Sequence, residues 1–495
     1  MTTTEVGAPA PAPDRSPPPR RRAWLGGAWW LLPPLVMALL GGWLLAQPRS
    51  LWYDELFTAE MAPLPVGRLF DAVVSGEGLL PYLRDAPPSY NGPYYAVAHV
   101  WLLVTGLSPD EWGLRLLSVV AAVAAVAVLT RAVGRLAGTG VAVAAGLVAA
   151  TNPFVVQYAA EARGYSIALL GTALAALGLA RWLDGRPRSL LLYGAGVAAA
   201  GLAHWFAVPV AAGFAVAAAV LRGRRARPVV AATALGAGPA LALVATAVAN
   251  GVGASGAEWI AGVGLAVPVQ LFQSWSGAWT PLVVATGLAG AVGLLWPAAG
   301  GRDARVVAAA WVGVPVVAVT AVELVRPVYV DRYLLPALLG LPVLVALAAR
   351  AWRPVAVVLL GTVLATSLWA TAREVRLGPK EDVRGAVAAV ARAHRPGEPV
   401  VAAARWDALG VDHYTRREHR SLVADVVLPP APVPAAATVW VVRRSRDGVK
   451  GDREKLAALD QELTGRGMQV VEERRFEGRY AGVLVQRWER APAPT

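Results

Sequence analysis

Long apolar stretches separated by short polar turns dominate the chain as far as residue 377. The first, Ala23 to Ala46, has 24 residues and no charge, which is enough for a helix to cross about 30 Å of hydrocarbon. Ten further apolar stretches follow, at residues 112–133, 140–157, 164–182, 189–206, 207–221, 228–249, 278–297, 306–323, 333–349 and 354–371. The pattern therefore predicts a polytopic α-helical membrane protein with about 11 transmembrane helices.

One more apolar stretch, Pro93 to Gly106, has only 14 residues and is short for a span. If it crossed the membrane, Arg131, Arg135 and most later arginine clusters would fall outside. Basic residues collect instead in cytoplasmic loops. We therefore interpret this stretch as a juxtamembrane helix on the membrane surface, within an outside loop at 47–110.

The N-terminal residues 1–22 are rich in Pro and Ala and end in three arginines. They are predicted to form a disordered cytoplasmic tail. The apolar run that follows is too long for the apolar region of a signal peptide, so we expect an uncleaved first helix. Eleven spans across the plasma membrane then place the C-terminus outside the cell.

The composition changes at about residue 378, where charged residues return. Strand-like and helix-like patterns alternate from there to residue 495, which predicts a small extracytoplasmic α/β domain after a transmembrane domain at 23–377. The expected helices are 381–394 and 453–466, and the expected strands are 399–404, 438–442, 468–471 and 483–486.

The amino-acid composition agrees with a membrane protein and indicates neither a nucleic-acid partner nor a metal site. Charged residues make up 16% of the chain, against about 25% in soluble proteins. The net charge of +13 comes almost wholly from arginine, and loop topology explains it without a nucleic-acid partner. The absence of cysteine and the five scattered histidines do not indicate a metal site.

Several charged residues fall at the predicted outer ends of helices, where arginine is normally rare. They are Asp54, Glu55, Arg84, Asp85, Glu111, Arg115, Glu161, Arg163, Glu323, Arg326, Asp331 and Arg332. One explanation is local pairing, for example of Glu111 with Arg115 one helical turn later. The other is a phosphate site, because the guanidinium group matches phosphate geometry.

An outer cavity with arginines and a carboxylate suits the transfer of a sugar from a polyprenyl phosphate. The arginines would neutralise the departing phosphate, and the carboxylate would take a proton from the acceptor hydroxyl. The chain shows no glycine-rich nucleotide motif. A transporter or lipid flippase is the alternative, although charges are nearly absent from the centres of the predicted helices. A membrane scaffold displaying the C-terminal domain would leave the outer charges unexplained.

Four segments in order resemble the GT-C superfamily of membrane glycosyltransferases, in the branch of protein O-mannosyltransferases and the lipid A aminoarabinose transferase. They are LWYDELFTAE, NGPYYAVAHVWLLVTGLSPDEWGLRLLSVV, NPFVVQYAAEARGYSIAL and DRYLLPALLGLPVL. The tail segment PKEDVRGAVAAVARAHRPGEPV is also similar to the family. The resemblance implies a GT-C fold and an inverting transfer of mannose or another hexose or pentose. It also implies a polyprenyl-phosphate donor and a hydroxyl acceptor on a glycan, lipid or protein.

The resemblance also implies roles for particular residues. Asp54 matches the general base and Glu55 the acidic position after it. The residues expected to bind substrate are Glu161, Arg163, Tyr165, Arg332, Tyr333, Tyr94, His99, Arg115 and Arg84. Packing is an equally good account of Tyr94 and His99, and the spacing of Arg84 from the proline pair that follows departs from the family pattern. No metal or other cofactor is required, although a divalent ion is compatible with the pattern.

Overall fold

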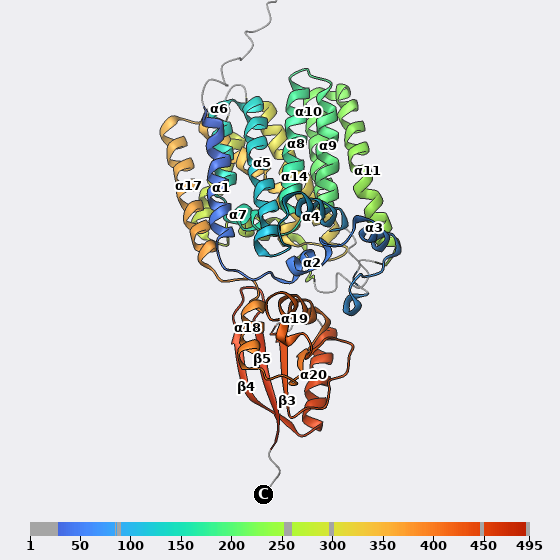
Figure 1. Ribbon diagram of the computed structural model, residues 1–495. Helices are drawn as coiled ribbons and strands as arrows, with labels where there is room; N and C mark the ends of the chain where they lie inside the picture. The colour runs from blue at the N-terminus through green and yellow to red at the C-terminus, as the bar shows by residue number, and fades with distance from the viewer. Residues whose placement is uncertain are drawn as a thin grey trace, which may run out of the picture.

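The computed structural model describes residues 28–84, 86, 91–251, 260–296, 301–445 and 450–491. A bundle of long helices forms one part, and a small α/β domain is attached to one end of it (Figure 1). The chain passes between the two parts after α17 (Arg353–Arg376) and before α18 (Val383–Ala393). The sequence boundary at residue 378 falls in this connection.

The bundle contains helices at all eleven predicted spans. They are α1 (Leu32–Leu45), α5 (Glu111–Ala137), α6 (Thr139–Thr151), α7 (Pro153–Ala159), α8 (Tyr165–Leu183), α9 (Ser189–Ala203), α10 (Val208–Arg222), α11 (Arg227–Ala249), α13 (Thr280–Leu295), α14 (Arg302–Glu323), α15 (Leu335–Leu338), α16 (Gly340–Leu347) and α17. Among the described residues, six helical stretches are long and apolar enough to cross a membrane, or nine if each bent pair is one span. One of the six, 205–249, contains both α10 and α11, and α9 is shorter. The count of 11 therefore stays a prediction.

Two of the predicted straight spans are bent. In the span predicted at 333–349, the helical stretches 331–338 and 340–350 meet at an angle of 48°. Residues 140–157 form α6 and α7, which meet at an angle of 66°. Asn152 is extended, and its side-chain oxygen accepts hydrogen bonds from the backbone N–H groups of Phe154 and Val155, while Pro153 begins α7. An asparagine cap followed by proline starts a new helix in a new direction. Another difference is α12 (Val267–Trp275), which forms between the predicted spans 228–249 and 278–297. Residues 252–259, in the same interval, lie outside the described residues.

The arginine-rich loops lie at one end of the bundle. Arg135 pairs with Asp184 at 2.8 Å, and Arg222 pairs with Asp303 at 3.1 Å. Arg350 donates a 2.7 Å hydrogen bond to the carbonyl of Ala137. These contacts gather loops that were all predicted to be cytoplasmic. In Figure 1 they occupy the end where α1 begins, and the α/β domain lies at the opposite end. The chain thus traverses the bundle an odd number of times.

Short helices cover the end of the bundle that faces the α/β domain. They are α2 (Tyr53–Met61), α3 (Val66–Ser75), the turn η2 (Pro81–Leu83) and α4 (Gly92–Thr105). The last is the helix expected at 93–106, and its Val100, Leu103 and Val104 are more than half exposed. An exposed apolar face agrees with the expected position on the membrane surface.

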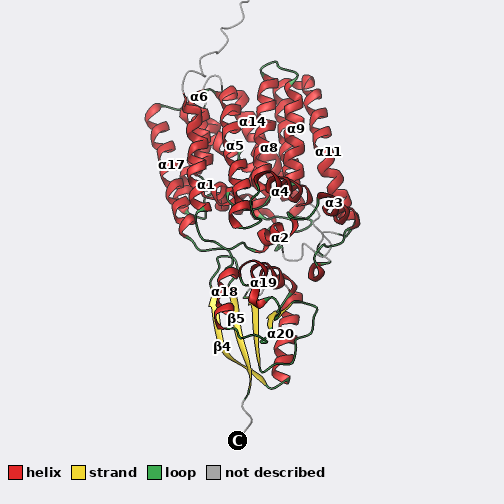
Figure 2. Ribbon diagram, viewed as in Figure 1, coloured by secondary structure: helices red, strands yellow, loops and turns green. Residues whose placement is uncertain are grey.

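The C-terminal domain is a five-stranded mixed sheet with helices on both faces (Figure 2). The strands are β1 (Val400–Ala402), β2 (Val426–Val427), β3 (Thr438–Arg444), β4 (Met468–Phe476) and β5 (Val483–Arg490), in the order β2-β1-β3-β5-β4. Strand β1 is parallel to β2 and β3, and β5 is antiparallel to β3 and β4. The structure confirms all six predicted elements in α18, α20 (Lys450–Gly465) and four strands. The prediction missed α19 (Arg405–Glu418) and β2.

The core of this domain continues into the membrane-side helices. Alternate residues of β3 face opposite layers, with Val439 and Val441 packed on the α20 side. Trp440 and Val442 belong to the other cluster, which also contains Leu56 of α2. The α/β domain is therefore packed directly on the helix that carries the predicted base.

Candidate active site

Helix α2 carries the two neighbouring carboxylates, and its first turn sends them into different surroundings. Trp52 precedes the helix in an extended conformation, and the carboxylate of Glu55 accepts a hydrogen bond from its backbone N–H. Acidic side chains are favourable there because the N-terminus of a helix carries partial positive charge. Glu55 is fully buried, whereas the side chain of Asp54 is 18% exposed. Asp54 is thus the carboxylate that solvent or a substrate can reach.

Glu55 is engaged on every side by protein groups. Arg115 of α5 forks onto it, with Nε 2.8 Å from Oε1 and Nη2 2.6 Å from Oε2. The backbone N–H of Ala162 donates to Oε1 at 2.9 Å. Arg115 also donates to the carbonyls of Arg49 and Ser50. This buried pair joins α2 to α5 and organises the site.

Arg115 does not make the local pair that was one explanation of its position. Its partner is Glu55, and Glu111 accepts a hydrogen bond from Tyr414 of α19 instead. Arg115 is only 7% exposed, and its guanidinium donates to four oxygen atoms. Its predicted role in substrate binding stays a prediction.

Asp54 meets arginines from two distant segments. Nη2 of Arg332, in the turn η7 (Asp331–Leu334), lies 3.9 Å from Oδ2 of Asp54. The same guanidinium donates through Nε to the hydroxyl of Tyr165 at 3.1 Å. Arg163 donates through Nη1 to the carbonyl of Asp54 at 3.3 Å and to the hydroxyl of Tyr95 at 3.1 Å. The structure therefore brings together a carboxylate and two arginines that are separated by more than 100 residues in sequence.

Glu161, in the turn between α7 and α8, pairs across the domain boundary. Nζ of Lys380 lies 2.6 Å from its Oε2, and the indole N–H of Trp52 donates to Oε1 at 3.2 Å. The lysine also lies 4.1 Å from the centre of the Trp52 ring. Burial raises the pKa of Glu161, and the charge of Lys380 opposes that rise. A cavity of about 40 Å³ adjoins these residues.

The remaining predicted residues differ in their surroundings. The ring of Tyr333 packs against His204 and Phe206, with centroids 5.1 and 4.9 Å away. Tyr94 is buried beside Tyr95. His99 Nδ1 lies 2.9 Å from the carbonyl oxygen of Ala62, just beyond the end of α2. The predicted roles of Tyr94 and His99 in substrate binding stay predictions.

Arg84 is exposed at the end of η2. None of the contacts among the described residues joins it to the Asp54 group, and Asp85, Pro87 and Pro88 lie outside the described residues. Its predicted role in phosphate binding remains untested.

Sequence reasoning missed three residues that the structure places at the site: Tyr95, Trp52 and Lys380. Tyr95 follows Tyr94 in the second family-like segment, where only Tyr94 was singled out. Lys380 had a detectable signal. It is one of only three lysines in a chain with 46 basic residues, and it stands in the family-like tail segment.

The carboxylates of the site do not form a metal donor set. Glu55 is bound by Arg115 and Glu161 by Lys380. Among the described residues, no three His, Asp or Glu side chains gather closely enough to hold a metal ion.

Sequence comparisons give no family. No family model matches the chain, and no curated protein matches it.

Solved structures do resemble it. ArnT from Cupriavidus metallidurans in the apo state superposes with a TM-score of 0.52 at 14% identity, over 92% of this chain and 97% of that one. The same protein bound to undecaprenyl phosphate gives 0.52 at 13% identity, over 92% and 98%. The archaeal oligosaccharyltransferase AglB from Archaeoglobus fulgidus, in complex with an inhibitory peptide and a dolichol-phosphate, gives 0.52 at 12% identity, over 82% and 65%. The arabinofuranosyltransferase AftD from Mycobacteria gives 0.52 at 15% identity, over 94% of this chain and 40% of that one.

These neighbours share an arrangement of helices rather than a recognisable sequence, and the two ArnT structures match almost from end to end. The chain therefore has the fold of the GT-C membrane glycosyltransferases.

Proposed function

We propose that this protein is an inverting glycosyltransferase that moves a sugar from a polyprenyl-phosphate donor to a hydroxyl acceptor. The observation that carries the proposal is the meeting of Asp54 with Arg332 and Arg163 at the end of the bundle next to the α/β domain. A partly exposed carboxylate is held beside two guanidinium groups that come from different segments of the chain. This arrangement supplies a base and a counter-charge for a leaving phosphate in one place.

The bond changes follow from these roles. The acceptor oxygen attacks the anomeric carbon as the bond from that carbon to the phosphate oxygen breaks. Asp54 takes the proton from the acceptor hydroxyl, and the lipid phosphate departs with the electron pair of the broken bond. Arg332 and Arg163 stabilise the negative charge that grows on the phosphate. Attack from the side opposite the phosphate inverts the anomeric configuration in a single step.

The fold supports this class of donor. Among the similar structures, one contains undecaprenyl phosphate and another a dolichol-phosphate. The proposed site also lies where the long apolar helices end and the polar domain begins. A lipid tail can remain in the bilayer there while its head group reaches Asp54.

We propose further that the site faces the outside of the plasma membrane and that no metal takes part. The arginine-rich loops at the other end of the bundle support the first statement, because such loops remain in the cytoplasm. The pairing of Glu55 and Glu161 with cations supports the second.

Membranes containing the protein, supplied with a panel of radiolabelled polyprenyl-phosphate sugars, test the proposal. We expect one donor to be consumed and its label to appear in a product with a new glycosidic bond, with and without a chelator. Membranes carrying Asp54→Asn are the control. If no donor is consumed more rapidly than in this control, the proposed function is wrong.

A further inference from the structure

The α/β domain contacts the residues immediately before Asp54 more closely than any sequence pattern suggested. Three successive backbone N–H groups precede Asp54, at Leu51, Trp52 and Tyr53. The hydroxyl of Tyr414 accepts from Leu51 at 2.8 Å, and the carboxylate of Glu381 accepts from Tyr53 at 3.2 Å. Both acceptors belong to the C-terminal domain. The C-terminal domain therefore accepts hydrogen bonds from two of the three backbone N–H groups that precede Asp54.

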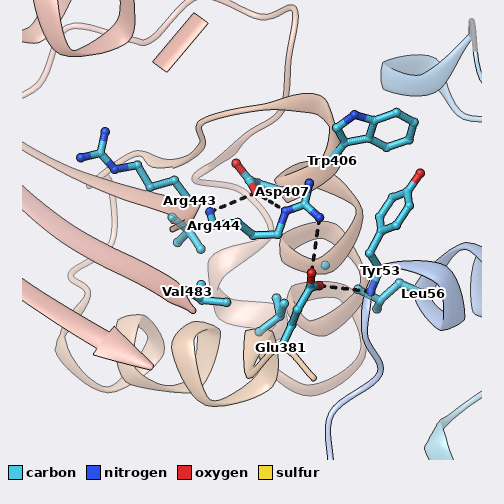
Figure 3. A pocket seen from close by; sticks show the side chains of 11 residues that line it. Tyr53, Leu56, Glu381, Trp406, Asp407, Arg443, Arg444 and Val483 are labelled. Atoms are coloured by element: carbon cyan, nitrogen blue, oxygen red, sulfur yellow. Dashed lines mark hydrogen bonds and ion pairs between the residues drawn. The ribbon is translucent and has the colours of Figure 1, made fainter. Parts of the chain in front are cut away.

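The side chain of Tyr53 is held in the same way. Its ring meets the ring of Trp406 edge to face, with centroids 4.9 Å apart, and the guanidinium of Arg444 lies 5.4 Å from its centre. Figure 3 shows Trp406, Arg444 and Glu381 arranged around Tyr53. The residue directly before Asp54 in the sequence is thus contacted by another domain through both its backbone and its ring.

Glu381 is itself held in place. It is 1% exposed, and its Oε1 lies 3.4 Å from Nη1 of Arg444. Arg444 in turn bonds Asp407 at 3.2 Å. The hydroxyl of Ser50 donates to the Glu381 carbonyl. A buried carboxylate with partners on several sides has little freedom to move, so the group it bonds is fixed as well.

The far end of α2 is tied to the same domain. Glu60 lies 2.8 Å from Nδ1 of His413 and 2.7 Å from Nη2 of Arg416, both on α19. Helix α2 has nine residues, and so short a helix is not stable without external contacts. Contacts at both of its ends therefore come from the α/β domain.

We propose that Glu381 is a positioning residue for Asp54, and that through it the C-terminal domain forms part of the active site. This inference rests on the proposed function, because it assigns Asp54 the role of base. Glu381 does not touch the substrate. It fixes the N-terminus of α2 and so the distance from the Asp54 carboxylate to the acceptor hydroxyl, and a displacement of about 1 Å can cost about 100-fold in rate.

The test uses the full-length protein and compares four forms: wild type, Glu381→Gln, Asp54→Asn and the double variant. We expect Glu381→Gln to lower kcat by about 10- to 100-fold. The KM for the lipid donor should stay unchanged, since the arginines proposed to bind its phosphate, Arg163 and Arg332, are not on α2. In the Asp54→Asn background the same change should have no further effect on the residual turnover. A residue that acts only through Asp54 loses its influence when the base is absent.

The control is Asp460→Asn, which removes a carboxylate of the same domain that pairs with Arg443 rather than contacting α2. This variant should match the wild type. If Glu381→Gln also matches the wild type while Asp54→Asn is slow, the positioning role is wrong and the proposed function survives. A further fall in turnover in the double variant would equally reject it, because the effect would then be one of general folding.

Normal turnover in Asp54→Asn would instead reject the proposed base, and the positioning role with it. If Glu381→Gln does not accumulate in membranes, Trp406→Leu provides the second test, since it releases Tyr53 without disturbing a buried charge. The same loss of kcat, again absent in the Asp54→Asn background, is expected for it. Full turnover in Trp406→Leu would contradict the proposal.

Discussion

Glu55 and Arg115 form a buried ion pair in which Oε2 of the glutamate lies 2.6 Å from Nη2 of the arginine. The pair closes a loop of 60 residues and joins the short helix α2 to the long helix α5. Neighbouring Asp54 has no such close partner among its described side-chain contacts, with its Oδ2 3.9 Å from Arg332. Two adjacent carboxylates therefore serve different purposes, one in structure and one in the proposed chemistry.

Because the Glu55–Arg115 pair is structural, we expect Arg115→Ala to destabilise the protein. The substitution leaves the Glu55 carboxylate buried without its cation, which costs about 3–5 kcal/mol. We expect a much lower thermal unfolding temperature for the protein purified in detergent. The matched control is Arg135→Ala, which breaks a more exposed pair with Asp184 worth about 0–1 kcal/mol. Equal stability of the two variants would show that the Glu55–Arg115 pair does not hold α2.

Arg163 is predicted to act on donor binding. Arg163→Ala removes a charged partner of the lipid phosphate, which should weaken donor affinity by about 2–5 kcal/mol. Arg163→Lys should restore only part of it, because lysine cannot offer a bidentate fork. Binding of a radiolabelled polyprenyl phosphate to the purified variants measures the effect. Unchanged affinity in both would mean that Arg163 only supports Tyr95 and the Asp54 carbonyl.

Much of the architecture could be predicted because the apolar stretches that form membrane helices can be recognised from the local sequence alone. Each long apolar stretch became helical, as one helix or as a bent pair, since a chain in lipid must satisfy its backbone hydrogen bonds within the segment. The break at Asn152 and Pro153 could also have been predicted, because asparagine followed by proline is typical of a helix start. It was overlooked because the residues around it are apolar. Helix α19 was missed for the opposite reason. Its buried face includes Asp407 and His413, so hydrophobic periodicity does not mark it.

The partners within the site could not be predicted in the same way. Family-like motifs selected Asp54, Arg163 and Arg332, and the structure brings these three together. The pairings of Glu55 with Arg115 and of Glu161 with Lys380 span 60 and 219 residues. Local spacing rules apply only to neighbours on one helix, and chain folding decides the rest.

The contact between Glu60 and α19 should make stability depend on pH. Burial opposes ionisation of Glu60, but the hydrogen bonds and charges of His413 and Arg416 outweigh it and lower its pKa below the ordinary value of 4.5. A depressed pKa contributes stability above pH 4.5, and this contribution is lost as the pH falls through the folded-state pKa.

We therefore expect the unfolding temperatures of the wild type and Glu60→Gln to differ most near pH 7 and to converge as the pH falls below 4.5. The control is Glu418→Gln, which alters a more exposed pair with Arg384. A difference between wild type and Glu60→Gln that is the same at pH 7 and at pH 3 would contradict the expectation.

Topology can be tested by cysteine labelling, because the chain has no cysteine of its own. Arg224→Cys, between α10 and α11 at the arginine-rich end, should be protected from an impermeant thiol reagent on intact cells. Asp460→Cys, in the α/β domain, should be labelled. Labelling of both after permeabilisation is the control for accessibility. The reverse pattern would place the proposed site in the cytoplasm.

Asp54 carries the central prediction. An acceptor hydroxyl is a poor nucleophile at neutral pH, so a base must take its proton as the new bond to the anomeric carbon forms. Asp54→Asn preserves the size of the side chain and removes its basicity. Turnover should fall by about 10²–10⁴-fold, while the amount of protein in the membrane and donor binding stay close to those of wild type. Glu55→Gln should have a smaller effect, because Glu55 orients the helix rather than meeting substrate.

Asp184→Asn serves as the matched control, since Asp184 pairs with Arg135 at the opposite end of the bundle and should not affect turnover. The configuration of the product gives an independent check. Direct attack by the acceptor requires inversion at the anomeric carbon, and a double displacement through a glycosyl-enzyme would give retention. NMR of the product distinguishes the two outcomes. Retained configuration, or full turnover in Asp54→Asn, would exclude Asp54 as the base of a single-step transfer.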